Sequence, residues 1–545
     1  MGAGAQANAN ISAGMSLPAI PPSGTRTCPV GRIRYAIFFD GTNNNAFRDW
    51  NPNFAEFKGG DSRAGTLTQR APNPKKKDDP LDPPNAPTNV AKLYTLFKEK
   101  PNLEERLYII GVGAGSATDT PDDGGAKETA QQATGYGARA KIDKGIEQLT
   151  NFVNRGPNPL SVEKRVDVFG FSRGSAEARD FLNKVKASGI EDKSQGKTDY
   201  RYVPAGRTVV RVPTYPRMTG ILFEFCGVFD TVASMGAGAL WSAGNVGYDF
   251  FVNGRPADKK KKPDEILNTP CEKEFVHDKE GWVHRTFHCI ADDEHRDLFP
   301  LEVLGRDPKG WWFRLLPRNM REQSYPGAHS DVGGGYRSTP GKAAVPPRKV
   351  TTYTEFGMPY EMEVGGSDAV LPKWGNLSHI PLADMHKEAM EGHVPLDPLS
   401  SLPADLWQID APGAPPGVPS LSSLYGSYIA LRTRLINQFV KRHSKWADYT
   451  KDIPHDPVYL QALPEGIYQN ICTERDKDAN YLSLYAYYIH LPSEATSWRI
   501  MDGIRRVVRI LTFGSSRDLN LISGQRQRDV HFMGLENSYD DDCYL

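Results

Sequence analysis

Apolar residues along the chain form short runs, and polar segments rich in glycine and proline separate these runs. Residues 33–39, 107–112 and 221–229 are apolar at nearly every position. Runs of this length and continuity are typical of strands that are buried on both faces of a parallel sheet. Val166 and Val168 alternate with charged residues, which indicates a further strand. The chain therefore has several candidate strands for a single sheet.

Amphipathic helical patterns lie between these strands. Residues 88–97 begin with a threonine that suits an N-cap, and residues 138–152 place Ile142, Ile146 and Leu149 on one face. Another helical pattern directly follows the strand that contains Val166. This alternation predicts an α/β fold, with a mostly parallel sheet flanked by helices and right-handed connections.

Segments rich in proline, glycine and polar residues divide the chain into three predicted parts. Residues 1–31 are expected to be a flexible leader, residues 32–400 the α/β domain, and residues 401–545 a mainly helical C-terminal region. Surface insertions in the α/β domain are predicted at 45–87, 233–285 and 337–376, and the last of these contains a candidate hairpin.

Two basic amphipathic stretches occur in the C-terminal region. Residues 421–446 place apolar residues such as Leu431 opposite basic ones that include Arg432 and Arg434, and residues 498–511 repeat the pattern. Either stretch could lie on a membrane surface or bind a partner. Core packing with a solvated basic face is the commoner explanation for such a pattern.

Composition excludes several classes of function. The 66 basic residues equal the 66 acidic ones, so no overall field favours nucleic acid or an anionic membrane as a partner. The six cysteines show no zinc-like spacing and are expected to be reduced thiols of a protein made in the cytoplasm. The N-terminus lacks the basic and apolar regions of a Sec signal peptide, so export would require another machinery.

Three patterns could be mistaken for cofactor or metal sites. The first is a set of glycines without the G-x-G-x-x-G spacing, and the second is a run of neighbouring polar residues that cannot all converge on one ion. The third is a set of histidines whose outer members are expected beyond the ends of a short helix. We reject all three and predict neither a cofactor nor a metal. The patterns are Gly111, Gly113 and Gly115; Asp292, Asp293 and His295; and His379, His386 and His393.

A candidate nucleophile lies where the strand that contains Val166 ends. The motif Gly170-Phe-Ser-Arg-Gly174 matches G-x-S-x-G, with a strand before it and a helix after it. In this context the serine occupies a strained strand-to-helix turn, and small residues two positions away let strand and helix approach closely. Ser172 is therefore the predicted nucleophile. The alternative is a glycine-bounded turn whose serine only caps the helix.

A small polar loop, residues 40–44, follows the first strand. Open α/β sheets place their ligand contacts outside the carboxyl ends of the strands. We expect Gly41 or Thr42 to offer a backbone N–H to an oxyanion, beside the N–H of Arg173. A plain β-turn is the alternative.

An acid and a histidine follow the serine in the order that α/β-type hydrolases use. Asp230 comes directly after the strand 221–229, where it could orient a histidine and stabilise its imidazolium form, or simply cap a helix. His329 lies between a Pro-Gly turn and three glycines, so its local chain can hold the ring over a nucleophile. No such turn precedes the rival histidines His284, His288 and His295.

Five motifs together resemble a known family. The set is similar to the motifs of type VI secretion lipase effectors of the Phe-Asp-Gly-Thr/Gly-Phe-Ser-Arg-Gly class, and the resemblance spans about residues 33–395. Ser175 stands where that family more often has alanine, and Phe229 where tryptophan is frequent. The motifs are Phe38-Phe-Asp-Gly-Thr-Asn43, Gly170-Phe-Ser-Arg-Gly174, Gly227-Val-Phe-Asp-Thr-Val232, Asp293-Glu-His-Arg296 and Pro326-Gly-Ala-His-Ser-Asp-Val-Gly-Gly-Gly-Tyr336.

The resemblance implies an α/β-hydrolase that cleaves acyl esters of membrane phospholipids, with Ser172, Asp230 and His329 as its catalytic triad. It also implies delivery into the periplasm of rival bacteria on a secretion spike or adaptor protein, and a cognate immunity protein in the producing cell. A1- and A2-type enzymes both occur in that family, so the acyl position stays open. A soluble carboxylester hydrolase and a non-catalytic lipase-fold scaffold are the alternatives.

Overall fold

The computed structural model describes a large part of the 545-residue chain. Most of the predicted leader (1–31) and of the insertions at 45–87, 233–285 and 337–376, and the whole basic stretch at 498–511, lie outside the described residues. No helix within the described part is long and apolar enough to cross a membrane. The described residues are 31–42, 44, 46, 86–112, 138–155, 162–205, 208–232, 283–294, 299, 301–304, 319–336, 348–353, 359–364, 374–410, 419–440, 460, 463, 465–490 and 530–531.

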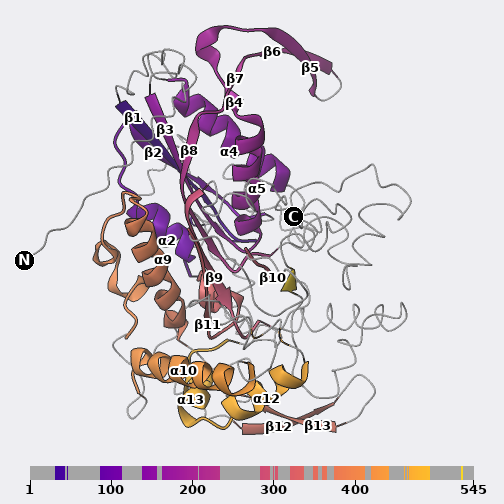
Figure 1. Ribbon diagram of the computed structural model, residues 1–545, viewed down its shortest axis with the longest axis vertical. Coiled ribbons are helices and arrows are strands. Elements are labelled where there is room, and N and C mark those ends of the chain that lie inside the picture. Colours follow the sequence, from indigo (N-terminus) through magenta and orange to yellow (C-terminus); the bar gives the residue numbers. More distant parts are fainter. Residues whose placement is uncertain are drawn as a thin grey trace, which may run out of the picture.

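Six parallel strands form the central sheet, in the order β11-β9-β8-β3-β1-β2 (Figure 1). The predicted α/β fold with a mostly parallel sheet is therefore confirmed. The strands are β1 (Gly31–Phe39), β2 (Glu104–Ile109), β3 (Val162–Phe171), β8 (Ile221–Phe229), β9 (Val283–Ala291) and β11 (Met320–Tyr325).

Alternate residues of each strand build two separate cores, one on each face of the sheet. Ala36 and Phe38 of β1 belong to one core together with Phe169 of β3, whereas Ile37 and Phe39 belong to the other. Successive side chains of a strand point to opposite faces, so a strand covered on both faces needs apolar residues at every position. This requirement explains the continuous apolar runs from which the strands were predicted.

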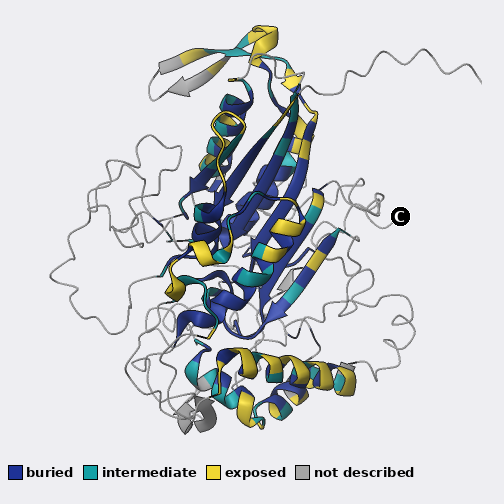
Figure 2. Cartoon of the chain, turned by 90° about the vertical axis from the view of Figure 1, so that its left-hand side faces the viewer, coloured by how far each residue is buried: buried dark blue, intermediate teal, exposed yellow. Residues whose placement is uncertain are grey.

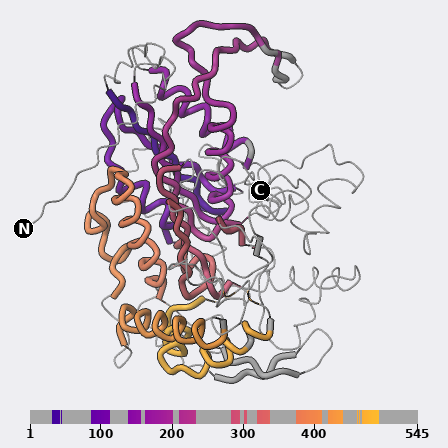
Figure 3. Tube along the Cα trace, viewed as in Figure 1, coloured from indigo at the N-terminus to yellow at the C-terminus, as the bar shows by residue number. Residues whose placement is uncertain are grey.

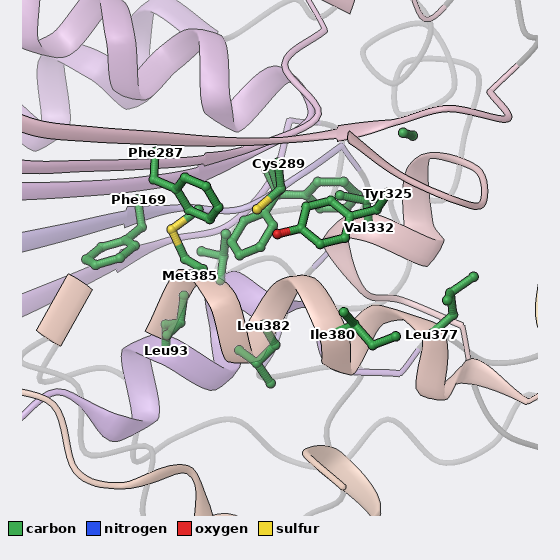
Figure 4. Close-up of a cluster of buried hydrophobic side chains, with 14 of the residues drawn as sticks. Leu93, Phe169, Phe287, Cys289, Tyr325, Val332, Leu377, Ile380, Leu382 and Met385 are labelled. Carbon is green, nitrogen blue, oxygen red and sulfur yellow. The ribbon is translucent and has the colours of Figure 1, made fainter. Parts of the chain in front are cut away.

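Helices cover both faces of the sheet. Apolar residues of α2 and α9 lie in the core with Phe38, and those of α4 and α5 lie in the core with Phe39. In Figure 4, Phe169 and Phe287 from the sheet lie against Met385 of α9. The helices are α2 (Asn89–Leu96), α4 (Ala138–Val153), α5 (Arg173–Ser188), the short α8 (His329–Gly333) and α9 (His379–Glu391).

Helix α9 begins earlier than the sequence indicated. The sequence predicted that His379 lies before the helix, but His379 is its first residue and Pro381 lies in its first turn. Proline is tolerated in the first turn of a helix, because the N–H that it lacks has no partner there. His379 and His386 bind different carbonyl groups, since Nδ1 of His379 lies 2.7 Å from Gln408 O and Nε2 of His386 lies 2.8 Å from Asp397 O.

The C-terminal helices pack against the end of the molecule at which β9 and β11 finish (Figure 3). Leu424, Tyr428 and Leu484 lie in the same core cluster as Phe38, so this core continues from the sheet into the C-terminal region. Figure 2 shows that the outer surface of these helices is exposed and the inner surface buried. The proposed division between residues 400 and 401 stays a prediction. The elements are α10 (Leu421–Leu435), the π-helical η8 (Ile436–Val440), α12 (Glu465–Arg475) and α13 (Ala479–Tyr487).

One residue of α10 does not lie where the helical pattern placed it. Arg432 was expected on the solvated basic face with Arg434. Its Nε instead donates to Asp292 Oδ2 at 3.1 Å, and its side chain is only 16% exposed. A carboxylate 140 positions earlier in the chain thus overrides the amphipathic pattern, whereas Arg434 is exposed as expected.

In the part of the chain that the structure describes, four two-stranded sheets accompany the central one. The sequence predicted only the antiparallel hairpin of β12 and β13, which is confirmed. It missed the hairpin of β5 and β6, which extends from the molecule at the top of Figure 1. The strands are β4 (Ile190–Glu191) with β7 (Arg217–Met218), β5 (Asp199–Ala205) with β6 (Thr208–Thr214), β10 (Leu301–Glu302) with β14 (Val530–His531), and β12 (Arg348–Tyr353) with β13 (Pro359–Val364).

Two basic side chains are buried between α2 and α9. Lys92 is 2% exposed, and its Nζ donates to Asn89 Oδ1 at 3.3 Å. Burial lowers the pKa of Lys92 to about 7, although Asp405 acts in the opposite direction. Burial and the Lys92 charge together lower the pKa of His379 to about 3. Folding therefore opposes protonation of both groups.

Replacing Lys92 by methionine should stabilise the protein most strongly at and below neutral pH. The unfolded chain binds the Lys92 proton below about pH 10.5 and the folded chain only below about pH 7, so the wild type loses stability as the pH falls between these values. Lys92→Met should raise the free energy of unfolding by about 1–4 kcal/mol at pH 7 and by less at pH 10. Urea denaturation at both pH values measures the difference.

The exposed Lys387 of α9 provides the matched control. Lys387→Met should leave the free energy of unfolding nearly unchanged at both pH values. A gain for Lys92→Met of the same size at pH 7 and pH 10 would contradict the explanation from charge burial.

Candidate active site

The register of the parallel sheet brings the carboxyl ends of its strands to one edge. Phe39 of β1 pairs with Gly170 of β3, and Phe171 of β3 pairs with Phe229 of β8. Because these strands end level with one another, the residues that follow them lie side by side. Ser172 and Asp230 are each the first residue after such a pair, so the sheet itself makes them neighbours.

Ser172 forms a sharp turn between β3 and α5. Its backbone φ is 59° and ψ is −129°, a conformation that side-chain-bearing residues rarely adopt. Its N–H donates to Phe229 O at 3.0 Å, and its carbonyl accepts the N–H of Val232 at 3.2 Å. Its side chain does not cap the helix, which removes support for the alternative reading of this serine as an N-cap. The residue is 2% exposed.

Glycines make this crowded turn possible. A Cβ at Gly170 would lie 2.5 Å from Ser175 Cα, and one at Gly174 would lie 2.4 Å from Asp40 O. A Cβ at Gly333 would fall 1.9 Å from the Phe171 ring. None of these separations is possible for real atoms, so the backbone of α5 can meet the β1 loop only where side chains are absent.

The loop after β1 is held by buried hydrogen bonds to Asp40. Asp40 Oδ1 accepts the N–H of Gly41 at 2.7 Å. Asp40 Oδ2 accepts the hydroxyl of Thr88 at 2.9 Å and also that of Tyr108. On the other side of the loop, Arg173 Nη1 donates to Thr42 Oγ1 at 2.8 Å.

These bonds affect the predicted oxyanion donors differently. The N–H of Gly41 already serves Asp40, whereas the side chain of Arg173 ties Thr42 to the first turn of α5. A donor pair made of the Arg173 N–H and the Thr42 N–H therefore fits the loop better than one that uses Gly41. The set of oxyanion donors stays a prediction, and these bonds favour Thr42 over Gly41 as the partner of Arg173.

Asp230 and His329 form a buried pair. His329 Nδ1 lies 2.6 Å from Asp230 Oδ2, and the second oxygen, Oδ1, accepts the N–H of Ala291 at 2.9 Å. Asp230 is fully buried, with φ at 39°. Because a carboxylate only accepts, Nδ1 carries the proton in this pair and Nε2 is the basic nitrogen.

His329 is the first residue of α8. The sequence had suggested instead that a glycine loop holds it. The Pro-Gly turn precedes the helix, with Gly327 at φ 105°, and the three glycines end it. The ring lies between the rings of Phe171, at 4.6 Å, and Phe299, at 4.9 Å. Its backbone N–H donates to Glu294 Oε2 at 3.2 Å.

The rival His288 belongs to a separate buried pair. Its Nδ1 lies 2.8 Å from Glu322 Oε1, and its Nε2 accepts the N–H of Thr231 at 3.2 Å. Burial lowers the pKa of His288, although Glu322 acts in the opposite direction. With both ring nitrogens engaged, His288 supports the turn after Asp230. Of the other rivals, His284 is largely exposed at the amino end of β9, and His295 lies outside the described residues.

Sequence reasoning did not find the polar groups that support this site. They belong to elements far apart in the chain, and those that fell within a recognised motif, Arg173, Asp293, Glu294 and Asp331, were not assigned a supporting side-chain role there. No shared sequence pattern marks them, since Thr88 and Tyr108 are not acidic and Glu322 lies in the polar stretch Met320–Tyr325. The missed residues are Thr88, Tyr108, Glu322 and Asp331, together with the side-chain role of Arg173.

Taken together, these groups have the parts needed for nucleophilic attack on a carbonyl. A strained serine begins a helix, an imidazole is oriented by a buried carboxylate, and a polar loop lies beside the first turn of the helix. Within the described residues, no cluster of His, Cys, Asp and Glu could hold a metal ion.

A protein-family model matches well over half of the chain, at residues 34–204 and 214–388. Its description is "T6SS, Phospholipase effector Tle1-like, catalytic domain". A comparison with curated proteins finds no match. The family match includes all the candidate residues described above.

Among solved structures, one similar chain is the Tle1 effector bound to the VgrG spike of the type 6 secretion system. It is 19% identical, the similarity covers 68% of this chain and 74% of that chain, and the TM-score is 0.37. An uncharacterized protein from Pseudomonas aeruginosa is also 19% identical, over 94% of this chain and 66% of that chain, with a TM-score of 0.36. The NocB thioesterase domain is 13% identical, over 55% of this chain and 87% of that chain, with a TM-score of 0.18.

Replacing either of two helical glycines by alanine should change the free energy of unfolding, but in opposite directions. Gly174→Ala should lower the free energy of unfolding by about 1–3 kcal/mol, because its Cβ would clash with Asp40 O. Gly426→Ala in α10 meets no atom within 4 Å and should raise it by about 0.5–1 kcal/mol, the usual helix-propensity gain. Urea denaturation of both variants tests the close packing, which a neutral or stabilising Gly174→Ala would contradict.

Proposed function

Because the chain belongs to the Tle1-like phospholipase effectors of the type VI secretion system, we propose that it hydrolyses acyl ester bonds of membrane glycerophospholipids. Ser172 is the nucleophile, His329 the general base and acid, and Asp230 the orienting carboxylate. Both A1-type and A2-type cleavage remain outcomes of the test below.

The 2.6 Å contact between His329 and Asp230 is the observation on which this assignment rests. The order Ser, Asp, His along the chain is that of α/β-hydrolases. The register of β3 with β8 sets Ser172 beside Asp230, which in turn binds the His329 ring. His288, which is likewise buried beside a carboxylate, has both ring nitrogens occupied within the protein.

The proposed reaction proceeds through an acyl-enzyme. His329 Nε2 removes the proton from Ser172 Oγ as that oxygen attacks the ester carbonyl, and Asp230 stabilises the imidazolium that forms. His329 then returns the proton to the leaving lysolipid oxygen, and the ester bond breaks. Water, activated by the same nitrogen, attacks the acyl-serine and releases the fatty acid.

The negative charge that develops on the carbonyl oxygen needs fixed donors. We assign these to the backbone N–H groups of Arg173 and Thr42. The bond from the Arg173 side chain to Thr42 Oγ1 ties the loop to the first turn of α5, which supports this assignment. Loss of one oxyanion donor typically lowers kcat by about 100- to 1,000-fold.

The route of delivery follows from the same family assignment. A similar chain is described as the Tle1 effector bound to the VgrG spike, and we propose a spike or adaptor protein as a partner of this chain as well. The proposed site of action is the membrane of a target cell, reached through the periplasm. A cognate immunity protein in the producing cell completes the proposal.

Ser172→Ala should abolish lipid hydrolysis and leave the fold unchanged. Mass spectrometry of phosphatidylethanolamine and phosphatidylglycerol vesicles should detect lysolipid and free fatty acid with the wild type. We expect a fall in rate of about 10⁴- to 10⁶-fold in the variant. Lipids with two different acyl chains show which position is cut. Ser188→Ala, at the exposed end of the same helix, is the matched control and should retain activity.

Each contrary outcome has its own meaning. Release of product from short-chain esters but not from vesicles would identify a soluble carboxylester hydrolase. No product from either substrate would favour a non-catalytic scaffold. A Ser172→Ala variant with near-normal activity would overturn the assignment of the nucleophile.

Two carboxylates that bind buried histidines should respond differently to amide substitution. Asp230→Asn should lower kcat by about 10⁴-fold, because an amide no longer selects the required tautomer of His329. Glu322→Gln should leave kcat of the same order and lower the free energy of unfolding by about 1–3 kcal/mol, because its new amide would be buried without a partner. Initial-rate kinetics and urea denaturation of both variants separate a catalytic role for Asp230 from a structural role for Glu322. A larger loss of kcat in Glu322→Gln than in Asp230→Asn would contradict this division of roles.

A further inference from the structure

Two buried carboxylates connect the His329 segment to the C-terminal helices. Asp293, in the loop after β9, is the first of them. Its Oδ2 accepts the N–H of Gly327 at 2.8 Å, and its own N–H donates to Gly327 O at 2.9 Å. Its Oδ1 accepts from Arg475 Nη1 at 2.8 Å and from the Tyr481 hydroxyl at 3.1 Å. One side chain therefore binds the turn before His329 with one oxygen and the C-terminal helices with the other.

Asp331 is the second bridge. Its Oδ2 accepts the N–H of Ala328 at 3.0 Å, which caps the helix that begins with His329. The same oxygen accepts the backbone N–H of His490 at 2.9 Å, and Oδ1 lies 2.6 Å from His490 Nδ1. The His490 ring stacks on Tyr336 with centroids 4.0 Å apart, which fixes the ring beyond the end of α8.

Both carboxylates depend on these partners because both are buried. Asp293 is 2% exposed and Asp331 is 1% exposed. A buried carboxylate is tolerated only when cations or N–H and O–H donors satisfy its oxygens, and removal of one partner leaves the remaining charge without solvent. Arg475 is itself only 8% exposed, so the pair with Asp293 has little access to water.

The contact points lie next to the proposed general base. Gly327 and Ala328 immediately precede His329, and Asp331 lies two residues after it. Relaxation of either bridge would let the backbone that carries the ring shift, although the contacts of His329 with Asp230 and Glu294 would remain. Displacements of about 1 Å at a reacting group can cost about 100-fold in rate.

We propose that Arg475 and His490 are positioning residues of the hydrolase, which act through Asp293 and Asp331 to hold the His329 segment in its reactive place. The inference rests on the proposed function, since it assigns His329 the role of general base. Both residues lie beyond residue 388, where the match to the catalytic-domain model ends. The C-terminal region thus completes the catalytic site and is more than an appendage to it.

This role predicts a characteristic kinetic change. Neither Arg475 nor His490 is placed on the substrate, so loss of either should lower kcat and leave KM nearly unchanged. The rate at which a fluorophosphonate reacts with Ser172 should fall in parallel. That reaction forms a bond from Ser172 Oγ to phosphorus, expels fluoride and requires His329 to take the serine proton, without any contribution from lipid binding.

His490→Leu tests the second bridge in the full-length chain. We expect kcat on vesicles and the fluorophosphonate rate to fall by about 10- to 100-fold. His490→Asn should restore most of both rates, because the asparagine amide can donate from nearly the position of Nδ1. His284→Leu is the matched control, since His284 also faces a carboxylate, at 3.8 Å from Glu224, but is 65% exposed and at the amino end of β9. It should behave as wild type.

Arg475→Met tests the first bridge, with Arg434→Met on the exposed face of α10 as its control. The single variant leaves Asp293 buried without its cation and could fail to fold. We therefore pair it with Arg475→Met/Asp293→Asn, which removes both charges together and should fold. The double variant should react with the fluorophosphonate more slowly than the wild type. In this variant the side chain of residue 475 no longer holds residue 293 against the His329 segment.

The results can separate this inference from the proposed function. Folded His490→Leu and double variants with wild-type kcat and fluorophosphonate rates would overturn the positioning role while leaving the triad intact. A rise in KM with unchanged kcat would also overturn it, since that pattern indicates a lipid contact. If the wild type itself neither hydrolyses esters nor reacts with the fluorophosphonate, the proposed function fails first and the positioning role fails with it.

Discussion

The close packing of three chain segments at the carboxyl edge of the sheet is the constraint on which the site depends. The turn at Ser172, the loop after β1 and the end of α8 meet where Gly170, Gly174 and Gly333 have no side chains. The parallel register brings these segments level, and the missing Cβ atoms let them touch. The strained backbone at Ser172 is then held by bonds to Phe229 and Val232, so tertiary contacts offset its local cost.

Much of this arrangement could be predicted from sequence because it depends on local patterns. The apolar runs at 33–39 and 221–229 specify strands covered on both faces, and G-x-S-x-G between a strand and a helix specifies the turn at Ser172. Interactions between distant residues could not be predicted in this way. The bond of Arg432 to Asp292 spans 140 positions and reverses the side on which the helical pattern placed that arginine.

Two of the histidine–carboxylate pairs among the described residues show why residue type alone does not define a site. The distance from Nδ1 to a carboxylate oxygen is nearly equal in the two pairs: 2.6 Å from His329 to Asp230 and 2.8 Å from His288 to Glu322. What differs is the second ring nitrogen. In His288 this second nitrogen, Nε2, accepts the N–H of Thr231 inside the protein. The ring of His329 instead packs against Phe171, the residue directly before Ser172. The sequence favoured His329 through its flanking turn and not through any property of the ring.

The contact between Arg475 and Asp293 also has a consequence for the synthesis of the protein. Ribosomes add about 5–20 residues per second, and Arg475 follows His329 by 146 positions in the sequence. For roughly 7–30 s at that speed, a nascent chain contains Ser172, Asp230 and His329 but not Arg475, the cationic partner of Asp293. On the proposed roles, full hydrolytic competence is reached only after Arg475 has been added to the chain. On the same proposal, a producing cell whose own membranes contain the substrate would meet fully active hydrolase only after this interval.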